Sequence, residues 1–423
     1  MKRVVVTGLG CVTPIGNSVE AFCDSLFAGR SGIAPFDLGA MPGALSPDPG
    51  IRFKTTAKVK GFDPSGNPEH RLTPSFMLTS ELGAQFGIVA ARQAVAASGL
   101  LRHYDPAEVA IVSGCSCGGR GADEDANRNL YTRNARVPPT AIIRTMASSG
   151  TSNIAIENGV TGPTLNVATA CASGTHALGL AFQMVRAGIA PAAIAGGYEA
   201  ALTYGFLRAW DSMRVVSPTA CRPFSADRDG MTLGEGAAMF TLEPLDAALA
   251  RGARIWAEIV GFGMSADAHH VTQPLARGAA LAMQRALDDA STTLGLAREQ
   301  TMERVGYINA HGTGTQTNDQ VEAAAIHQTF AELAPRIPIG ATKAQTGHSI
   351  GAAGAIEALA TVLALDAAGL PPTAGVTEID PALNLDVIVR QQRPLAPGKH
   401  LALSNSLAFG GLNAVLALRR YTG

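Results

Sequence analysis

The sequence predicts an α/β fold built from two similar halves, with parallel or mixed sheets covered by helices on both faces. Short apolar segments alternate with helical patterns along the whole chain. The order of elements in residues 1–254 recurs in residues 255–423, although the residues themselves repeat only weakly. The 423 residues include 47 glycines, and only 5% are aromatic. This composition suits helices packed closely on sheets.

In the first half, the predicted strands are short apolar runs and the predicted helices repeat apolar residues at helical spacing. The strands are 4–7, 109–113, 164–169, 192–197 and 234–242, and the helices are 19–28, 84–97, 141–157 and 172–187. The first strand ends in the turn Gly8-Leu9-Gly10, and the first helix ends at Gly29. Residues 36–76 and 120–140 show little periodicity, so both are predicted to be irregular surface segments.

The second half continues the alternation. Its predicted strands are 256–261, 305–309, 337–341, 400–404 and 414–419, and its predicted helices are 278–291 and 351–368. Since sites on α/β folds usually lie where strands end, we expect a site between the two halves.

Composition narrows the class of protein. The net charge is -1 and charged residues are 16% of the chain, so neither nucleic acid nor a membrane surface is an expected partner. No apolar run approaches the roughly 20 residues of a membrane span. The 6 cysteines are scattered, which is typical of a cytoplasmic protein and not of a disulfide framework. Cys115 and Cys117 are spaced as half of a metal site, but no matching Cys/His pair accompanies them.

Cys171 is the predicted nucleophile. It lies where an apolar strand passes through a cluster of Ala, Ser, Thr and Gly into an Ala/Leu-rich helix. At a helix N-terminus, free N–H groups and the helix dipole favour a thiolate, and small neighbours let a substrate carbonyl approach. An isolated cysteine is more often buried and inert. Two histidine motifs further along the chain favour the catalytic interpretation.

The first histidine motif is N-A-H-G-T-G-T at 309–315, and the second is T-K-A-Q-T-G-H-S-I-G-A-A-G at 342–354. Each places a histidine in a glycine-rich turn, which presents an imidazole to a cleft. Either histidine alone would more often be structural. A fourth stretch, S-N-S-L-A-F-G-G-L-N at 404–413, has paired glycines that let backbone N–H groups face a ligand.

With T-A-C-A-S-G at 169–174, these stretches resemble the β-ketoacyl-acyl carrier protein synthases of the elongating, KAS II-like kind, in the thiolase superfamily. The resemblance covers nearly the whole chain. It implies a five-layered α/β/α/β/α fold from two duplicated halves. It also implies a decarboxylative Claisen condensation, which elongates chains in fatty-acid or type II polyketide or polyene biosynthesis, with no organic cofactor and no metal.

The resemblance assigns roles to the motif residues. Cys171 would accept an acyl group from the phosphopantetheine of an acyl carrier protein as a thioester. His311 and His348 would donate N–H groups to the malonyl thioester carbonyl and stabilise the enolate left by decarboxylation, which His311 would assist. The backbone N–H groups of Cys171 and Phe409 would form the oxyanion hole.

Four further residues would support this site. By the family pattern Lys343, which would otherwise be read as a surface lysine, pairs with Glu357 and fixes the electric field around His348. Asp319 and Glu322 would support the same network without reacting themselves.

Other positions concern the acyl chain and the carrier. Phe409 would also gate the acyl pocket, preceded by Leu407 and an alanine where the family commonly has glycine. Cys117 replaces a bulky aliphatic residue that lines the acyl pocket in relatives. Arg214 falls where the family commonly places an arginine that docks the carrier, whereas the usual basic run is weak at 69–74. These departures favour a specialised member, of nodulation, polyene or type II polyketide type, over general fatty-acid elongation.

Two alternatives to the elongating enzyme remain. One is a non-catalytic, chain-length-determining partner subunit of a ketosynthase heterodimer, which the intact Cys171, His311 and His348 argue against. The other is a thiolase or acyltransferase acting on coenzyme A, disfavoured because no cysteine follows Cys221. Family members form two-fold dimers, so the resemblance implies a homodimer, with a heterodimer with a paralogue as the other arrangement.

Overall fold

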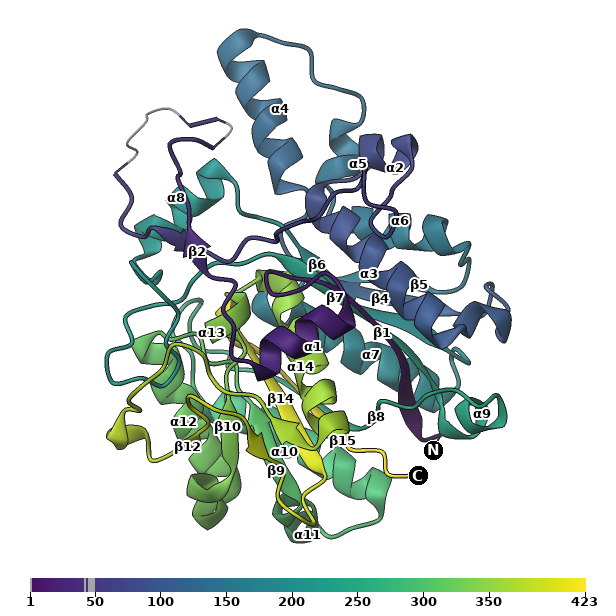
Figure 1. The fold of residues 1–423 in the computed structure, drawn as a ribbon, viewed down its shortest axis with the longest axis vertical. Helices are drawn as coiled ribbons and strands as arrows, with labels where there is room; N and C mark the ends of the chain where they lie inside the picture. Colours follow the sequence, from purple (N-terminus) through teal and green to yellow (C-terminus); the bar gives the residue numbers. More distant parts are fainter. Residues whose placement is uncertain (1, 42, 45–49) are drawn as a thin grey trace.

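The computed structural model describes residues 2–41, 43–44 and 50–423 (Figure 1). Most strands follow the predicted apolar runs. They are β1 (Val4–Val12), β4 (Ala110–Gly114), β5 (Thr164–Val167), β6 (Ala193–Glu199), β7 (Gly236–Pro244), β8 (Ala257–Ala266), β9 (Val305–Asn309), β10 (Pro338–Gly340), β12 (Asp386–Val387), β14 (Leu401–Ala408) and β15 (Leu412–Arg419). Two-residue strands pair as β2 (Ala34–Pro35) with β3 (Thr55–Thr56), and β11 (Gly369–Leu370) with β13 (Arg393–Pro394).

The helices vary from single turns to five turns. They are α1 (Val19–Phe27), α2 (Pro74–Thr79), α3 (Leu82–Ser98), α4 (Arg120–Arg133), α5 (Ala141–Thr145), α6 (Ser149–Asn158), α7 (Ser173–Ala187), α8 (Tyr204–Met213), α9 (Leu245–Ala250), α10 (Ala276–Leu294), α11 (Arg298–Glu303), α12 (Gln316–Phe330), α13 (Lys343–Thr346) and α14 (Ala353–Ala367). Short 3₁₀ turns η2 (Ala170–Ala172) and η4 (Ile350–Ala352) precede α7 and α14.

The two halves repeat one strand order. In the first half the order is β5-β4-β6-β7-β1, and in the second it is β10-β9-β14-β15-β8, with β12 added at the edge. The directions of the paired strands match as well. In each half the first two pairs of adjacent strands are parallel, and the last two pairs are antiparallel. β1 and β8 join the halves through three residue pairs, which makes one 11-stranded sheet of the described strands.

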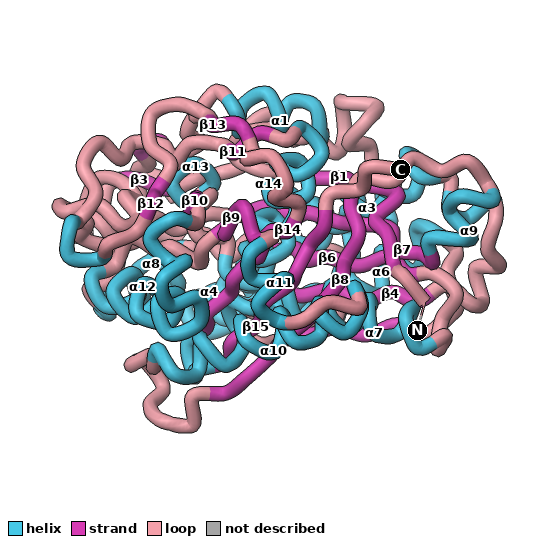
Figure 2. Tube along the Cα trace, turned by 90° about the horizontal axis from the view of Figure 1, so that it is seen from below, coloured by secondary structure: helices cyan, strands magenta, loops and turns pink. Residues whose placement is uncertain are grey.

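Five layers result from this arrangement (Figures 1 and 2). Helices α3 and α6 cover the outer face of the first half, and α10 and α12 cover the outer face of the second. Helices α7 and α14 pack against each other and against strands of both halves, so they form the middle layer. The predicted α/β/α/β/α fold of two duplicated halves is confirmed.

The position of α14 in the middle layer explains why this helix is so apolar. The stretch Ile350–Ala367 is long and apolar enough to cross a membrane by length and composition, but 89% of it is buried inside the fold. The sequence interpretation missed this stretch as a candidate span. A helix packed between two sheets is apolar all round for the same reason as a membrane helix, since neither meets water.

Two other expectations about the elements were wrong, and several helices were not predicted. Residues 120–140, predicted to be irregular, contain α4, which projects from the body of the molecule in Figure 1. The predicted helix 141–157 is split into α5 and α6 because Met146 is extended. No helix was predicted where α12 lies.

Candidate active site

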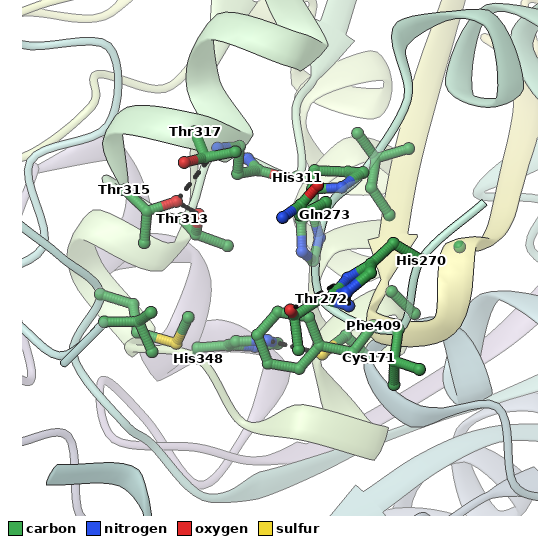
Figure 3. A pocket seen from close by; sticks show the side chains of 18 residues that line it. Cys171, His270, Thr272, Gln273, His311, Thr313, Thr315, Thr317, His348 and Phe409 are labelled. Carbon is green, nitrogen blue, oxygen red and sulfur yellow. Dashed lines mark hydrogen bonds between the residues drawn. The ribbon is translucent and has the colours of Figure 1, made fainter. Parts of the chain in front are cut away.

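Residues from all four motifs surround one cavity of about 120 Å³ (Figure 3). Its lining includes Cys171 from η2, His311 after β9, His348 after α13 and Phe409 after β14. These elements belong to different halves, so the site lies between the halves as predicted. The fold thus brings together segments that are far apart in the sequence.

A strained residue presents Cys171. Ala170 has a φ of +48°, in the left-handed region that residues with a Cβ adopt at a cost. This turns the chain sharply between β5 and α7, so that the side chain of Cys171 enters the cavity at the start of the middle layer. Ile350, at the same place before α14, has a φ of +47°. The two halves therefore share this turn.

Three groups meet the Cys171 sulfur. His348 Nε2 lies 3.0 Å from Sγ (Figure 3). The backbone N–H groups of Phe409 and of Cys171 itself are directed at the same sulfur. The two predicted oxyanion-hole donors thus converge on one point. A tetrahedral oxyanion formed at a carbonyl bonded to this sulfur would lie within reach of both.

Cys171 is a thiol at neutral pH, contrary to the expectation that the helix N-terminus holds a thiolate. Burial raises the pKa of Cys171 to about 11, although the Lys343 charge and the N–H groups of Phe409 and Cys171 oppose that rise. Desolvation outweighs these interactions because the thiol is buried. The neighbouring imidazole of His348 is then the acceptor for the thiol proton.

This pKa predicts how alkylation depends on pH. The rate of iodoacetamide addition at Cys171 is expected to rise about tenfold per pH unit from about pH 7 to 10, because the thiolate fraction grows by that factor below the pKa. Peptide mass spectrometry can follow the modification of this one cysteine. A rate that is already level near pH 7 would contradict the prediction and restore the thiolate interpretation.

Lys343 and Glu357 form a buried ion pair behind the two histidines. The ammonium group contacts the Glu357 carboxylate and donates to the backbone oxygen of His311 at 2.6 Å. Burial raises the pKa of Glu357 to about 7 against the opposing effect of Lys343. The geometry agrees with the predicted pair and excludes the surface interpretation of this lysine, which is 0% exposed.

Lys343 also fixes which nitrogen of His311 carries the proton. Its Nζ lies 3.1 Å from His311 Nδ1. Because an ammonium group only donates, Nδ1 accepts, and the proton of the neutral ring is on Nε2. Burial, with the charge of Lys343, holds the pKa of His311 well below its ordinary value, so the ring is neutral at pH 7.

His348 is neutral for similar reasons, since burial and the Lys343 charge hold its pKa well below the ordinary value. Its ring lies edge-on to that of His311, with centroids 5.4 Å apart. Its backbone N–H donates to the Thr232 carbonyl at 2.7 Å, and its own carbonyl accepts from Gly234 at 2.9 Å. The turn that carries this histidine is thus fixed by main-chain bonds to the first half.

Two buried carboxylates of α12 hold the first histidine motif. Glu322 accepts the backbone N–H groups of His311 and Gly312, both at 2.8 Å. Asp319 accepts those of Phe224 at 2.8 Å and Gly314 at 3.2 Å. Both residues therefore hold the His311 loop from outside the cavity lining.

Phe409, the predicted gate residue, lines the cavity. Its ring stacks on Trp210, with centroids 5.9 Å apart, and the glycines at 410 and 411 that follow it both have positive φ. Leu407 lines the cavity as well. Cys117 lies in the apolar cluster around Phe409 and Trp210, which also holds Ile350. This set is called the gate cluster below.

The remaining predicted residue, Arg214, ends α8 in a left-handed conformation and is exposed. Its neighbour Val215 lines the cavity, so Arg214 stands next to the cavity mouth. The sequence interpretation named no role for Trp210 or for Thr313 and Thr315, which line the gate and the mouth. The two threonines lie inside a motif already noticed, whereas Trp210 gave no signal.

Fold and site together define a thiolase-like condensing enzyme with a cysteine nucleophile. Comparison with known proteins narrows this class. The family models "Beta-ketoacyl synthase, N-terminal domain" and "Beta-ketoacyl synthase, C-terminal domain" match residues 1–248 and 256–377. The chain therefore belongs to the β-ketoacyl synthase family, and it is a KAS II-like acyltransferase that condenses a Cys-bound acyl group with malonyl-acyl carrier protein.

Relatives of two kinds share the full length of the chain. "3-oxoacyl-[acyl-carrier-protein] synthase 2" of Synechocystis sp. is 39% identical over 99% of this chain and 98% of its own. "Nodulation protein E" of Rhizobium meliloti is 36% identical over 99% of both. Among solved structures, "The ishigamide ketosynthase/chain length factor" has a TM-score of 0.90 and 34% identity over the whole of both chains.

Proposed function

We propose that Cys171 carries the acyl group, that His311 and His348 stabilise the enolate, and that the N–H groups of Cys171 and Phe409 form the oxyanion hole. One observation carries this assignment: His348 Nε2 and both N–H groups meet at the Cys171 sulfur. A thiol, a proton acceptor and two oxyanion donors at one atom are the groups that acyl transfer requires.

Acyl transfer comes first. As the Cys171 sulfur attacks the acyl thioester of the carrier, its proton passes to His348 Nε2, 3.0 Å away. The tetrahedral oxyanion lies between the N–H groups of Phe409 and Cys171. Its collapse breaks the bond to the phosphopantetheine sulfur, which takes the proton from His348 and leaves as a thiol.

Condensation follows on the acyl-enzyme. The malonyl thioester carbonyl accepts from His311 Nε2–H and from His348, whose neutral ring must first move its one proton from Nδ1 to Nε2, because Nε2 gave up the thiol proton in the first half-reaction. Loss of carbon dioxide leaves its electron pair in an enolate. The enolate carbon attacks the Cys171 thioester, and the oxyanion again lies between the N–H groups of Phe409 and Cys171. The attack itself forms the carbon–carbon bond. Collapse of the oxyanion then breaks the carbon–sulfur bond and releases the Cys171 thiolate, which regains a proton that ultimately comes from solvent.

An acyl carrier protein is the proposed partner, with Arg214 as part of the docking surface. Support comes from its exposed place near the cavity mouth and from charge, since carriers are acidic. A solved relative, 28% identical with a TM-score of 0.85, is "AntDE:AntF (apo): type II PKS acyl-carrier protein in complex with its ketosynthase bound to the hexaketide". With the nodulation relative, it favours a specialised pathway.

We further propose a homodimer formed along β5. This strand is at one end of the sheet, and Leu165 in it is 50% exposed. Ile156, on the preceding α6, is 69% exposed. An edge strand with exposed apolar residues is a surface for pairing with a second chain. A ketosynthase paralogue is the other occupant, as in the solved relative "Ketosynthase (ApeO) in Complex with its Chain Length Factor (ApeC) from Xenorhabdus doucetiae".

The proposal also covers cofactors, cellular location and domain boundaries. The chemistry above uses only side chains, backbone N–H groups and carrier-bound substrates, so it needs no metal or organic cofactor. Cysteine usage supports a cytoplasmic location. Residues 1–254 and 255–423 are proposed as the two domains, consistent with the end of α9 at Ala250 and the start of β8 at Ala257.

Intact-mass spectrometry tests the nucleophile and the substrate together. Incubation with a panel of acyl-carrier proteins is expected to add one acyl mass to the wild type and none to Cys171→Ala, since the thioester forms at this sulfur. The donor that reacts fastest identifies the preferred chain. If no donor acylates the wild type, while a co-expressed paralogue becomes acylated, the partner-subunit alternative is correct.

A further inference from the structure

Glu199 is a buried carboxylate to which the reaction above gives no role. It ends β6 and is 0% exposed. Its Oε2 accepts the backbone N–H groups of Ser116 at 2.9 Å and Cys117 at 3.1 Å. The Cys115 thiol donates to its Oε1 at 3.4 Å, and the N–H of Gly351 is also directed at the carboxylate. This side chain thus gathers four donors from two segments.

The segment whose amides bind Glu199 contains a residue of the gate cluster. Ser116 and Cys117 follow β4, and Cys117 belongs to the gate cluster with Phe409 and Trp210. Burial, the Glu199 carboxylate and the nearby Cys171 sulfur each raise the pKa of the Cys117 thiol. Cys117 is therefore close both to the nucleophile and to the residue that gates the acyl side of the cavity.

In the second half, two consecutive backbone amides also bind one buried carboxylate at the equivalent position. Two and three residues after the end of β4, Ser116 and Cys117 donate to Glu199; two and three residues after the end of β9, His311 and Gly312 donate to Glu322. Glu199 comes from a strand and Glu322 from α12, so the carboxylate has a different origin in each half. Only the arrangement of two amides on one buried carboxylate recurs.

We propose that Glu199 is a positioning residue for acyl transfer. By holding the amides of Ser116 and Cys117 it fixes the wall of the gate cluster against which the acyl chain lies, as Glu322 fixes His311 for decarboxylation. Hydrogen bonds to a carboxylate are stronger than those between neutral groups, so this wall is held firmly. The inference rests on the proposed role of Cys171. It adds that a carboxylate of the first half positions groups for acyl transfer and one of the second half positions groups for decarboxylation.

The Gly351 contact does not make Glu199 a support of His348. Gly351 is three residues after His348, but that histidine has its own main-chain bonds to Thr232 and Gly234. Loss of the Glu199 carboxylate should therefore loosen residues 115–117 and leave the malonyl side in place.

Hydrogen exchange measures the positioning directly. In Glu199→Gln, the amides of Ser116 and Cys117 are expected to exchange about tenfold faster or more than in wild type, because their bonds to a charged acceptor are lost. Those of His311 and Gly312 should be unchanged. Glu322→Gln is the matched control and should give the reverse pattern. Equal exchange at the Ser116 and Cys117 amides in wild type and Glu199→Gln would overturn the proposal, whether or not the enzyme is active.

The two half-reactions give the functional readout. With Glu199→Gln, acyl-Cys171 formation from the preferred acyl-carrier protein is expected to slow about tenfold or more, while release of labelled carbon dioxide from malonyl-carrier protein stays within about threefold of wild type. Glu322→Gln should slow carbon dioxide release and spare acylation. A purely structural role would lower both rates in each variant, and that result would overturn the proposal.

Folding and the proposed function are controlled separately. If Glu199→Gln does not fold, Glu199→Asp can replace it, because it keeps the charge but shortens the side chain. It should give the same changes in amide exchange and acylation, but smaller ones, and leave carbon dioxide release unaffected. If wild type forms no acyl-enzyme, the proposed function fails on its own, whereas faster exchange at the Ser116 and Cys117 amides in the variant still supports the positioning role.

Discussion

Replacing Cys171 by alanine is expected to lower condensation by about four orders of magnitude or more, because the sulfur that carries the acyl chain is removed. Release of carbon dioxide from malonyl-carrier protein should persist, since His311 and His348 belong to the other half of the site and contact the nucleophile only through His348 Nε2. Labelled carbon dioxide and β-ketoacyl product, measured in the same reaction, separate the two steps.

Cys115→Ala is a suitable control for this variant. Cys115 is buried near the site, but its thiol donates to Glu199 and lies outside the cavity lining. It should keep acylation within about tenfold of wild type, because one weak thiol donor is lost. If Cys171→Ala still made product at a comparable rate, the nucleophile assignment would be wrong.

Removing the buried cation should have the next largest effect. Lys343→Met leaves the Glu357 carboxylate buried without its partner, which typically costs about 3–5 kcal/mol of unfolding free energy. It also removes the donor to His311 Nδ1, so that the ring is no longer held with its proton on Nε2. Urea unfolding should show the loss of stability, and carbon dioxide release should fall by about a hundredfold, as when an oxyanion donor is removed.

The double variant Lys343→Met/Glu357→Gln separates these two effects. Neutralising the carboxylate removes the uncompensated buried charge, so most of the stability should return. Decarboxylation should not return, since His311 still lacks its donor. If activity recovers together with stability, Lys343 acts only through the fold, and its role in holding the His311 proton is excluded.

Most of the site could be predicted from sequence because its residues lie in short motifs at strand ends. The strand before Cys171, the strand before His311 and the glycines after Phe409 each gave a local signal. The Lys343–Glu357 pair followed from the family pattern. The charge state of Cys171 did not, because helix position is visible in a sequence whereas burial of one sulfur depends on the packing of both halves.

Helices α12 and α4 were both missed, for opposite physical reasons. Helix α12 buries Asp319 and Glu322, so polar residues occupy positions where a pattern search expects apolar ones. The carboxylates that hold the histidine loop therefore also hide the helix. In α4 only Ala122 is buried, which leaves no apolar stripe to detect. The stack of Trp210 on Phe409 joins residues far apart in the chain, and no local pattern reports such a contact.

The shared turn before α7 and α14 can carry a nucleophile in one half only. With the left-handed residues Ala170 and Ile350 aligned, Gly351 stands where Cys171 stands. A Cβ at Gly351 would lie 2.7 Å from the Ser116 nitrogen and 2.8 Å from Glu199 Oε2. That turn has no room for a side chain of any kind. Of the two equivalent turns, one therefore presents a thiol to the cavity, and the other is a backbone contact against Ser116 and Glu199.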